Sequence, residues 1–291
     1  MILLTSPYFI RGRVFESFLV THKLLALVAV GGTLWHIFSG EFIKLLFPII
    51  SLSVWSMTTV YRFVRNSRNR GYISSHATFA QRGRGYSRCA MELNVRLPGH
   101  VNAGPGAYVY LSFSWLPWRY RYQAHPLMVV CCEHEVEERD GKEHDATILT
   151  FLAQPQKGLT ARLYRELQVE GPPVRKLVSF DGPYGQDLHL ERYEMVMLVA
   201  KGIGIVGVLP YARYLAGRQH HDGDIRKKLR LASTLNKPKL RNSLYRDATR
   251  KVDILWILEF NRQEEWISEQ LRTLQDLDPH RVSRPHSGGW S

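Results

Sequence analysis

Cysteine is scarce in this sequence. Only three of its 291 residues are cysteines, namely Cys89, Cys131 and Cys132. Two of them are adjacent and no pair has the C-x-x-C spacing, which argues against a zinc site. An odd number of cysteines without regular spacing also argues against a scaffold held together by disulfides. We therefore expect the soluble part of the chain to lie in a reducing compartment.

Acidic residues are also few, at 26 against 39 lysines and arginines, which gives a formal net charge of +13. Such an excess suits nucleic acid, anionic lipid or phosphorylated ligands. No recognition helix, zinc knuckle or RNA-binding signature accompanies the charge, so nucleic acid is the weaker interpretation. Much of the excess flanks an apolar hairpin, which favours a lipid bilayer. The sequence offers neither an acid–base pair nor a nucleophile triad.

Two apolar runs near the start are predicted to span a membrane. They cover residues 18–38 and 42–63, and about 20 apolar residues are needed to cross a bilayer. Pro48 in the second run can kink a spanning helix without preventing it. A signal peptide would have a shorter apolar region and a cleavage site. Cations cluster at the outer ends, which places both ends in the cytoplasm; they are Arg11, Arg13, Lys23, Arg62, Arg65, Arg68 and Arg70.

Two histidines lie in the first run, His22 and His36. Their separation is ~21 Å along a helix, and they fall within ~40° of one face. One imidazole near each membrane surface suits the axial ligation of two stacked haems. Interfacial side chains that reach the headgroups would show the same pattern. The second run contains no histidine, so this hairpin does not supply the other axial ligands.

Short alternating runs separated by Gly and Pro follow from about residue 72. Regularly spaced runs of this kind predict strands of a small antiparallel barrel. The runs cover residues 89–98, 107–117, 125–135, 146–155 and 174–185.

From about residue 191 the pattern changes to strand, glycine turn and helix. An apolar strand at 195–200 leads into a Gly202-Ile203-Gly204 turn, and a second apolar strand follows at 252–260. Alternating strands and helices predict a parallel sheet. A G-x-G turn between a strand and a helix allows a dinucleotide pyrophosphate to approach the backbone at the helix N-terminus.

Four motifs follow one another in a specific order: Gly106–Leu111, His125–Met128, Asp181–Gly185 and Gly202–Ile205. Together with the histidines of the first run, they resemble the fungal ferric reductase and NADPH oxidase family from about Arg13 to Leu277. The resemblance implies a transmembrane α-helical hairpin followed by a ferredoxin-reductase-like soluble part. That part would comprise an antiparallel β-barrel for FAD and an incomplete α/β parallel-sheet domain for NADPH.

The resemblance implies that four consecutive residues, His125, Pro126, Leu127 and Met128, lie along the isoalloxazine ring of FAD. Relatives often carry a hydroxyl residue where this chain has Met128. A short helix opening at Gly158, Leu159 and Thr160 would bind the FAD pyrophosphate, with Thr160 as its cap. Lys157 and Arg162 would add positive charge there.

The NADPH site implied by the resemblance consists of Gly185, at the nicotinamide entrance, and the turn Gly202, Ile203, Gly204 and Ile205. Lys201 departs from the family, which usually has a small or hydroxyl residue there. A 2′-phosphate needs a cation, and the candidates are Arg213, Arg218 and Arg250.

We therefore expect a membrane region at 1–70, a FAD-binding barrel at 71–190, a partial NADPH-binding domain at 191–278 and a disordered tail at 279–291. The implied activity is that of a ferric-chelate reductase of the plasma membrane, with the soluble domains cytoplasmic. Electrons would pass from NADPH through FAD and haem b to an extracellular ferric chelate. A superoxide-producing oxidase and a non-catalytic fragment are the alternatives. Relatives extend beyond both ends, so partner membrane helices or subunits are expected.

Overall fold

The computed structural model describes residues 15–38, 46–68, 75–83, 89–121, 123–139, 142–156, 158–170, 174–231 and 236–277. The chain divides into two compact units, Met1–Arg68 and Asn69–Ser291. The tail predicted at 279–291 lies outside the described residues. The predicted division at residue 190 falls inside the second unit.

The first unit contains two helices, α2 (Phe15–Phe38) and α3 (Leu46–Arg68). Hydroxyl side chains on both helices donate to carbonyls four residues earlier, as Thr33 does to Ala29 and Ser53 does to Ile49. Such bonds satisfy polar side chains without a partner from another element. Across the described residues, no helix has both the length and the apolar character that crossing a membrane requires. The spans at 18–38 and 42–63 therefore stay predictions.

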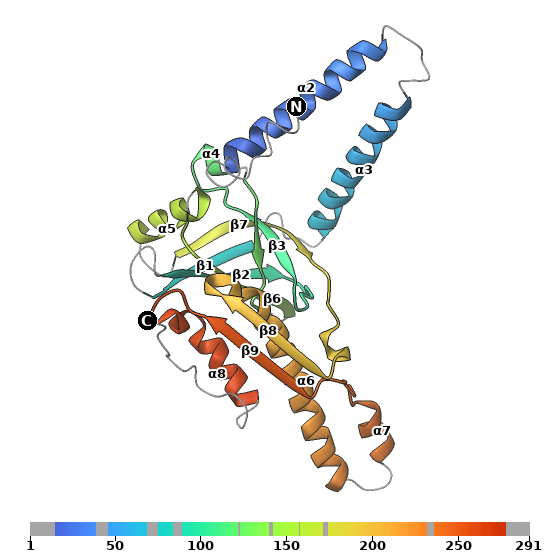
Figure 1. Cartoon of the computed structure of the whole chain (residues 1–291), viewed down its shortest axis with the longest axis vertical. Coiled ribbons are helices and arrows are strands. Elements are labelled where there is room, and N and C mark those ends of the chain that lie inside the picture. The colour runs from blue at the N-terminus through green and yellow to red at the C-terminus, as the bar shows by residue number, and fades with distance from the viewer. Residues whose placement is uncertain are drawn as a thin grey trace. The chain divides into compact units, whose positions relative to one another are not determined.

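The second unit begins with a seven-stranded antiparallel sheet in the order β4-β3-β7-β1-β2-β6-β5. Figure 1 labels β1, β2, β3, β6 and β7 of this sheet. The two edge strands of this sheet, β4 and β5, follow one another in the chain and are separated by two residues. The predicted barrel is therefore a sheet whose two edges are connected through these two residues. Two helices accompany it, α4 (Trp118–Arg121) and α5 (Leu159–Glu170). The strands are β1 (Ser75–Arg82), β2 (Ala90–Pro98), β3 (Tyr108–Ser112), β4 (His125–Met128), β5 (Cys131–Arg139), β6 (Lys142–Ala153) and β7 (Val174–Tyr184).

The run predicted as one strand at 125–135 is divided between two strands, and this corrects the sequence analysis. The N–H of Val129 donates to Ala107 (2.9 Å), whereas the N–H of Val130 donates to Thr150 (2.8 Å). The chain therefore leaves the β3 side of the sheet and joins β6 between these two residues. The apolar residues continue from β4 into β5, so the sequence does not show where the chain changes its partner strand.

Alternate residues of the strands build the first hydrophobic core. Leu93 on β2, Leu149 on β6 and Phe180 on β7 are almost completely buried. Each such side chain contributes about 1.5–3 kcal/mol relative to an exposed one. The core thus fixes which face of each strand is left for ligands.

A parallel pair, β8 (Met195–Lys201) and β9 (Lys251–Ile257), follows the antiparallel sheet. The sequence predicts nucleotide binding for this region, and we call residues 191–277 the nucleotide part. Along β8 the residues alternate between buried and exposed, with Met195, Met197 and Val199 exposed. The long helix α6 (Ile205–Leu231) follows the turn after β8. The remaining elements are η4 (Leu190–Arg192), η5 (Gly202–Gly204), α7 (Lys237–Asn242), η6 (Gln263–Ile267) and α8 (Ser268–Leu277).

The second hydrophobic core joins the two parts of this unit. Ala90, Val130 and Leu152 of the antiparallel part pack in one cluster with Leu209 of α6 and Trp266 of η6. Arg82 on β1 adds a polar link, because it pairs with Glu92 of β2 and with Glu269 of α8. The nucleotide part is therefore built directly onto the sheet.

Candidate functional site

Three tyrosines form a half-exposed aromatic surface on β3 and β7. Tyr108, Tyr110 and Tyr184 have ring centroids 5.8 Å apart in every pair. Their strand neighbours Val109 and Leu111 are fully buried, so the alternation of β3 turns the tyrosines away from the core. We call these three residues the tyrosine face. Tyr184 is held in place because its hydroxyl donates to Asp181 Oδ1 at 2.5 Å.

The predicted flavin residues form β4, which pairs with β3. Met128 lies opposite Tyr108, and Pro126 lies opposite Tyr110. Cross-strand partners share a face of the sheet, so these two predicted residues border the tyrosine face. Leu127 and His125 alternate to the other side, where Leu127 packs against the first core. His125 lies within 3.4 Å of Gln123 Oε1.

The three tyrosines lie within the motifs Gly106–Leu111 and Asp181–Gly185, but no role was predicted for them from the sequence. The signal that could have found them is the Tyr-Val-Tyr alternation of residues 108–110, which places two rings on one face of a strand. Tyr184 could not be added from its sequence position, because its proximity depends on the pairing of β3 with β7.

The helix α5 begins at Leu159 and follows Gly158, whose φ of +77° favours glycine. Leu159 is buried in the first core. The prediction that Thr160 is the N-cap is wrong: Thr160 lies inside the helix, and its hydroxyl accepts from the backbone N–H of Gln156 at 3.0 Å. The first amides of α5 still lack intrahelical partners, as at any helix start. Arg162 pairs with Glu166, and Lys157 lies outside the described residues.

The predicted glycine turn is η5, between β8 and α6. Gly202 has a φ of +54°, and a Cβ there would lie 2.5 Å from the Glu259 carboxylate. Gly204 differs, because a Cβ on it would meet nothing within 4 Å. Ile205 is buried and anchors the start of α6, while Ile203 packs against the same core. The turn therefore has an open side at Gly204 and a carboxylate on the side of Gly202.

Gly185 lies at the junction between the sheet and α6. Its φ is +123°, and a Cβ on it would lie 2.5 Å from the carbonyl oxygen of Gly106. Gly106 in turn has a φ of +79° and leaves no room for a side chain beside the Tyr211 hydroxyl of α6. Tyr211 also donates to the Gln186 carbonyl at 3.4 Å. These close approaches explain why glycine is required at both positions, whether or not a nucleotide binds there.

The three cations proposed for a 2′-phosphate are not at the turn. Arg218 is thirteen residues into α6, ~20 Å along the axis from its start, and its two bonds to Asp247 (2.6 and 2.5 Å) raise its pKa. Arg250 precedes β9 and lies at the amino end of the strand, whereas the turn follows the carboxyl end of β8. Arg213 lies near Cys131, where burial raises the thiol pKa to about 11 and Arg213 opposes that rise.

The haem ligands predicted from the sequence fall on one helix. His22 and His36 both belong to α2. His22 is exposed, and the side chain of His36 lies outside the described residues. The helix α3 contributes no histidine.

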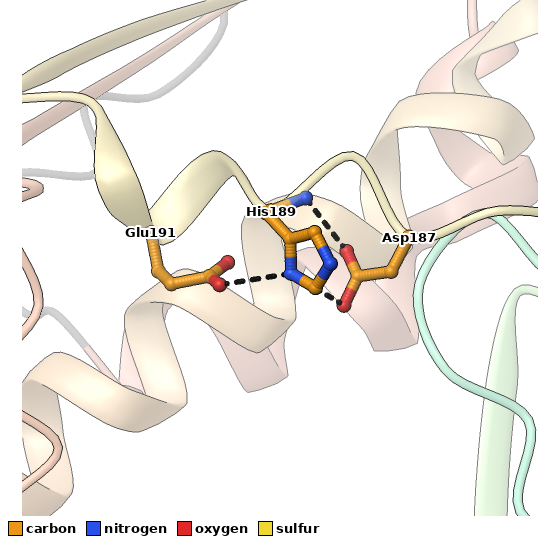
Figure 2. Close-up of side chains that lie close together, drawn as sticks. All are labelled: Asp187, His189 and Glu191. Atoms are coloured by element: carbon orange, nitrogen blue, oxygen red, sulfur yellow. Dashed lines mark hydrogen bonds and ion pairs between the residues drawn. The ribbon is translucent and has the colours of Figure 1, made fainter.

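The linker between β7 and β8 contains one compact cluster of possible metal ligands, the only one among the described residues. The ligand atoms of Asp187, His189 and Glu191 all lie within 4.8 Å of one another. Figure 2 shows the imidazole between the two carboxylates, with Nδ1 3.2 Å from Glu191 Oε1 and the backbone N–H bonded to Asp187. Both contacts join residues two positions apart in the chain, so this cluster stabilises the linker locally.

No family model matches the chain. It is similar to Ferric reductase transmembrane component 3 of Saccharomyces cerevisiae, with 26% identity over 198 residues that cover 68% of this chain and 25% of the relative. Ferric reductase transmembrane component 6 of the same yeast is 24% identical over 218 residues, covering 73% of this chain and 28% of the relative. The chain is related to the ferric reductase transmembrane components. It spans about a quarter of the length of these ferric reductases.

Among solved structures, a ferredoxin-NADP+ reductase from Plasmodium falciparum aligns with 72% of this chain and 71% of its own. Its sequence identity is 13% and the TM-score is 0.40.

Proposed function

We propose that this chain carries the flavin- and nicotinamide-binding part of a membrane oxidoreductase of the ferric-chelate reductase type. Electrons would pass from a reduced nicotinamide dinucleotide, NADPH in the family that the sequence resembles, through FAD and haem b to an extracellular ferric acceptor. The observation that carries the proposal is a glycine turn between a parallel strand and a helix, packed in one unit with the tyrosine face. The similarity to ferric reductase components supports the same route.

The tyrosine face fits an isoalloxazine ring. Aromatic side chains offer flat apolar surfaces on which a planar ring stacks, and Pro126 and Met128 extend this surface on the neighbouring strand. FAD, when bound, accepts a hydride and releases its electrons singly. Met128 has no hydroxyl to donate to the flavin edge, so its contribution is packing. The first amides of α5 are suited to the FAD pyrophosphate.

The glycine turn fits a dinucleotide pyrophosphate. The open side of Gly204 allows a phosphate to approach the backbone, and the N-terminus of the 27-residue helix α6 favours negative charge. Trp256 Nε1 donates to the carbonyl of Gly202 at 2.9 Å and fixes the turn. Because positioning the two cofactors is the task of the protein, the chain needs no acid–base residue.

The membrane part of the proposal rests on α2 and α3. Large apolar side chains are exposed on both helices, for example Leu27 and Trp55, and exposed apolar surface of this extent indicates a partner. We propose a bilayer as that partner, with the soluble unit on the cytoplasmic side of the plasma membrane. Haem bound through His22 and His36 would take its remaining axial ligands from other membrane helices or subunits.

An anaerobic visible spectrum of the full chain, purified in detergent and supplied with FAD, tests the proposal. We expect bound FAD to give a flavin spectrum that bleaches on addition of a reduced nicotinamide dinucleotide. Tyr110→Ala should weaken FAD binding because it removes part of the stacking surface. The matched control is Tyr193→Ala, an exposed tyrosine of the linker, which should bind FAD as the parent chain does. A chain that retains no flavin would contradict the proposal.

A further inference from the structure

A carboxylate stands beside the glycine turn where the second parallel strand ends. Ile257, the last residue of β9, pairs with Lys201, the last residue of β8. The turn starts one residue after Lys201, and Glu259 follows Ile257 by two residues. The side chain of Glu259 reaches the turn, because a Cβ on Gly202 would lie 2.5 Å from Glu259 Oε2 and 2.7 Å from Cδ.

Two hydrogen bonds fix the backbone around Glu259 and the turn. The backbone N–H of Glu259 donates to Oε1 of the buried Gln263 at 2.8 Å. The indole of Trp256 bonds the carbonyl of Gly202 and ties β9 to the turn. The Glu259 side chain is nevertheless 39% exposed, so a ligand seated on the turn can reach it.

This position has a known use in dinucleotide-binding units. The pyrophosphate lies on the glycine turn, and an acidic residue after the second strand accepts hydrogen bonds from the adenosine ribose. That residue follows the turn by about 20 positions in the common arrangement. Here the long α6 and the segment containing α7 increase the separation, but the parallel pairing still brings Glu259 to the turn.

A 2′-phosphate would meet an unfavourable charge at this place. Its charge would lie beside the Glu259 carboxylate, and like charges at contact distance repel. Among the described residues, Lys201 and Arg262 are the cations closest in sequence to the two strand ends. Lys201 Nζ is 3.9 Å from Glu259 itself, and Arg262 Nε is 3.9 Å from Glu265. Each of these two cations is therefore already paired with a carboxylate.

We infer that the nucleotide site takes a dinucleotide with a free ribose 2′-hydroxyl, which is NADH rather than NADPH, and that Glu259 accepts hydrogen bonds from that ribose. This inference rests on the proposed function. It departs from the cofactor that the family resemblance implies.

Binding measurements on the full chain in detergent, loaded with FAD, test it. Titration calorimetry with NAD+ and NADP+ avoids turnover and reads binding alone. We expect NAD+ to bind about 10- to 100-fold more tightly, the range that corresponds to hydrogen bonds to a charged acceptor. The fragments 5′-AMP and 2′,5′-ADP should show the same order.

Two substitutions separate charge from fold. Glu259→Gln should weaken NAD+ binding and reduce the preference, whereas Glu259→Arg should reverse it by offering a cation to the 2′-phosphate. Asp276→Asn, an exposed site on the last turn of α8, removes the same charge elsewhere and should leave the preference unchanged. Thermal unfolding of each variant identifies any loss of folded protein.

The outcomes distinguish the inference from the function on which it rests. Equal or tighter binding of NADP+ by the parent chain overturns the inference alone, as does a preference that Glu259→Arg leaves intact. Absence of binding by either dinucleotide to the FAD-loaded chain overturns both the proposed function and the inference.

Discussion

At the scale of single residues, Asp222 shows how one buried carboxylate organises the nucleotide part. Its two oxygens accept from the backbone N–H groups of Tyr245 (2.9 Å) and Arg246 (3.1 Å). Burial alone would raise the pKa of Asp222, but these amides, with His221 and Arg226 nearby, bring it below the usual value. The carboxylate therefore joins α6 to the segment that leads into β9.

Replacing Asp222 by asparagine should destabilise the chain by about 1–3 kcal/mol at pH 7, because one buried amide loses its acceptor. The folded-state pKa is lowered, so the stabilisation is complete above the unfolded value of about 3.9 and is lost as pH falls through the folded value. The difference between parent and variant should therefore shrink in acid. Urea unfolding between pH 7 and pH 3 measures it, with Asp224→Asn, at a half-exposed carboxylate two residues away, as control. A difference independent of pH would contradict this account.

The position of single residues in the fold was predictable where a local pattern determines it. The Gly202-Ile203-Gly204 turn was predicted because a strand and a helix flank it, and the structure places it there. Glu259 was missed because it is 55 residues beyond Gly204, and only the pairing of β8 with β9 brings the two ends together. The N-cap role of Thr160 was wrong because α5 begins at Leu159, two residues earlier than a cap at Thr160 requires.

At the scale of elements, the junction of β3, β7 and α6 depends on two glycines in close approach. Gly106→Ala should cost roughly 1–2 kcal/mol for the left-handed backbone conformation and about 1–3 kcal/mol for crowding Tyr211. Urea unfolding monitored by circular dichroism measures the sum. Gly104→Ala is the matched control, since a Cβ there meets nothing within 4 Å. Equal stability of the two variants would show that α6 moves aside without cost.

Elements were predicted well where apolar and polar residues alternate between Gly or Pro boundaries, as at 89–98 and 174–185, which correspond closely to β2 and β7. The strand β1 was missed because Ser75–Arg82 has few large apolar residues, and its place in the sheet comes from pairing with β2 and β7. The run at 125–135 was predicted as one strand, because a change of partner strand leaves the alternation of side chains intact.

At the scale of the whole molecule, the second core predicts cooperative unfolding of the entire second unit. Because Val130 and Leu152 pack with Leu209 and Trp266, the nucleotide part cannot open without exposing residues of the sheet. Hydrogen exchange of the full chain across a urea series should show β6 and α6 losing protection at one urea concentration. Loss of protection in α6 at a clearly lower concentration would mean that the two parts fold independently.

The braced linker of Asp187, His189 and Glu191 has a mechanical consequence for that unit. Thr249 Oγ1 donates to the Leu190 carbonyl at 3.1 Å, and the N–H of Ala248 donates to the Glu191 carbonyl at 2.9 Å. The segment before β9 therefore also holds the linker by hydrogen bonds, and we expect the connection between β7 and β8 to be rigid. A rigid connection fixes the distance between the tyrosine face and the glycine turn during folding. Two ligands bound at these places would therefore meet at a distance set by the backbone. Since a misplacement of about 1 Å can slow a reaction about 100-fold, stiffness in these few residues would tune the rate without touching either ligand.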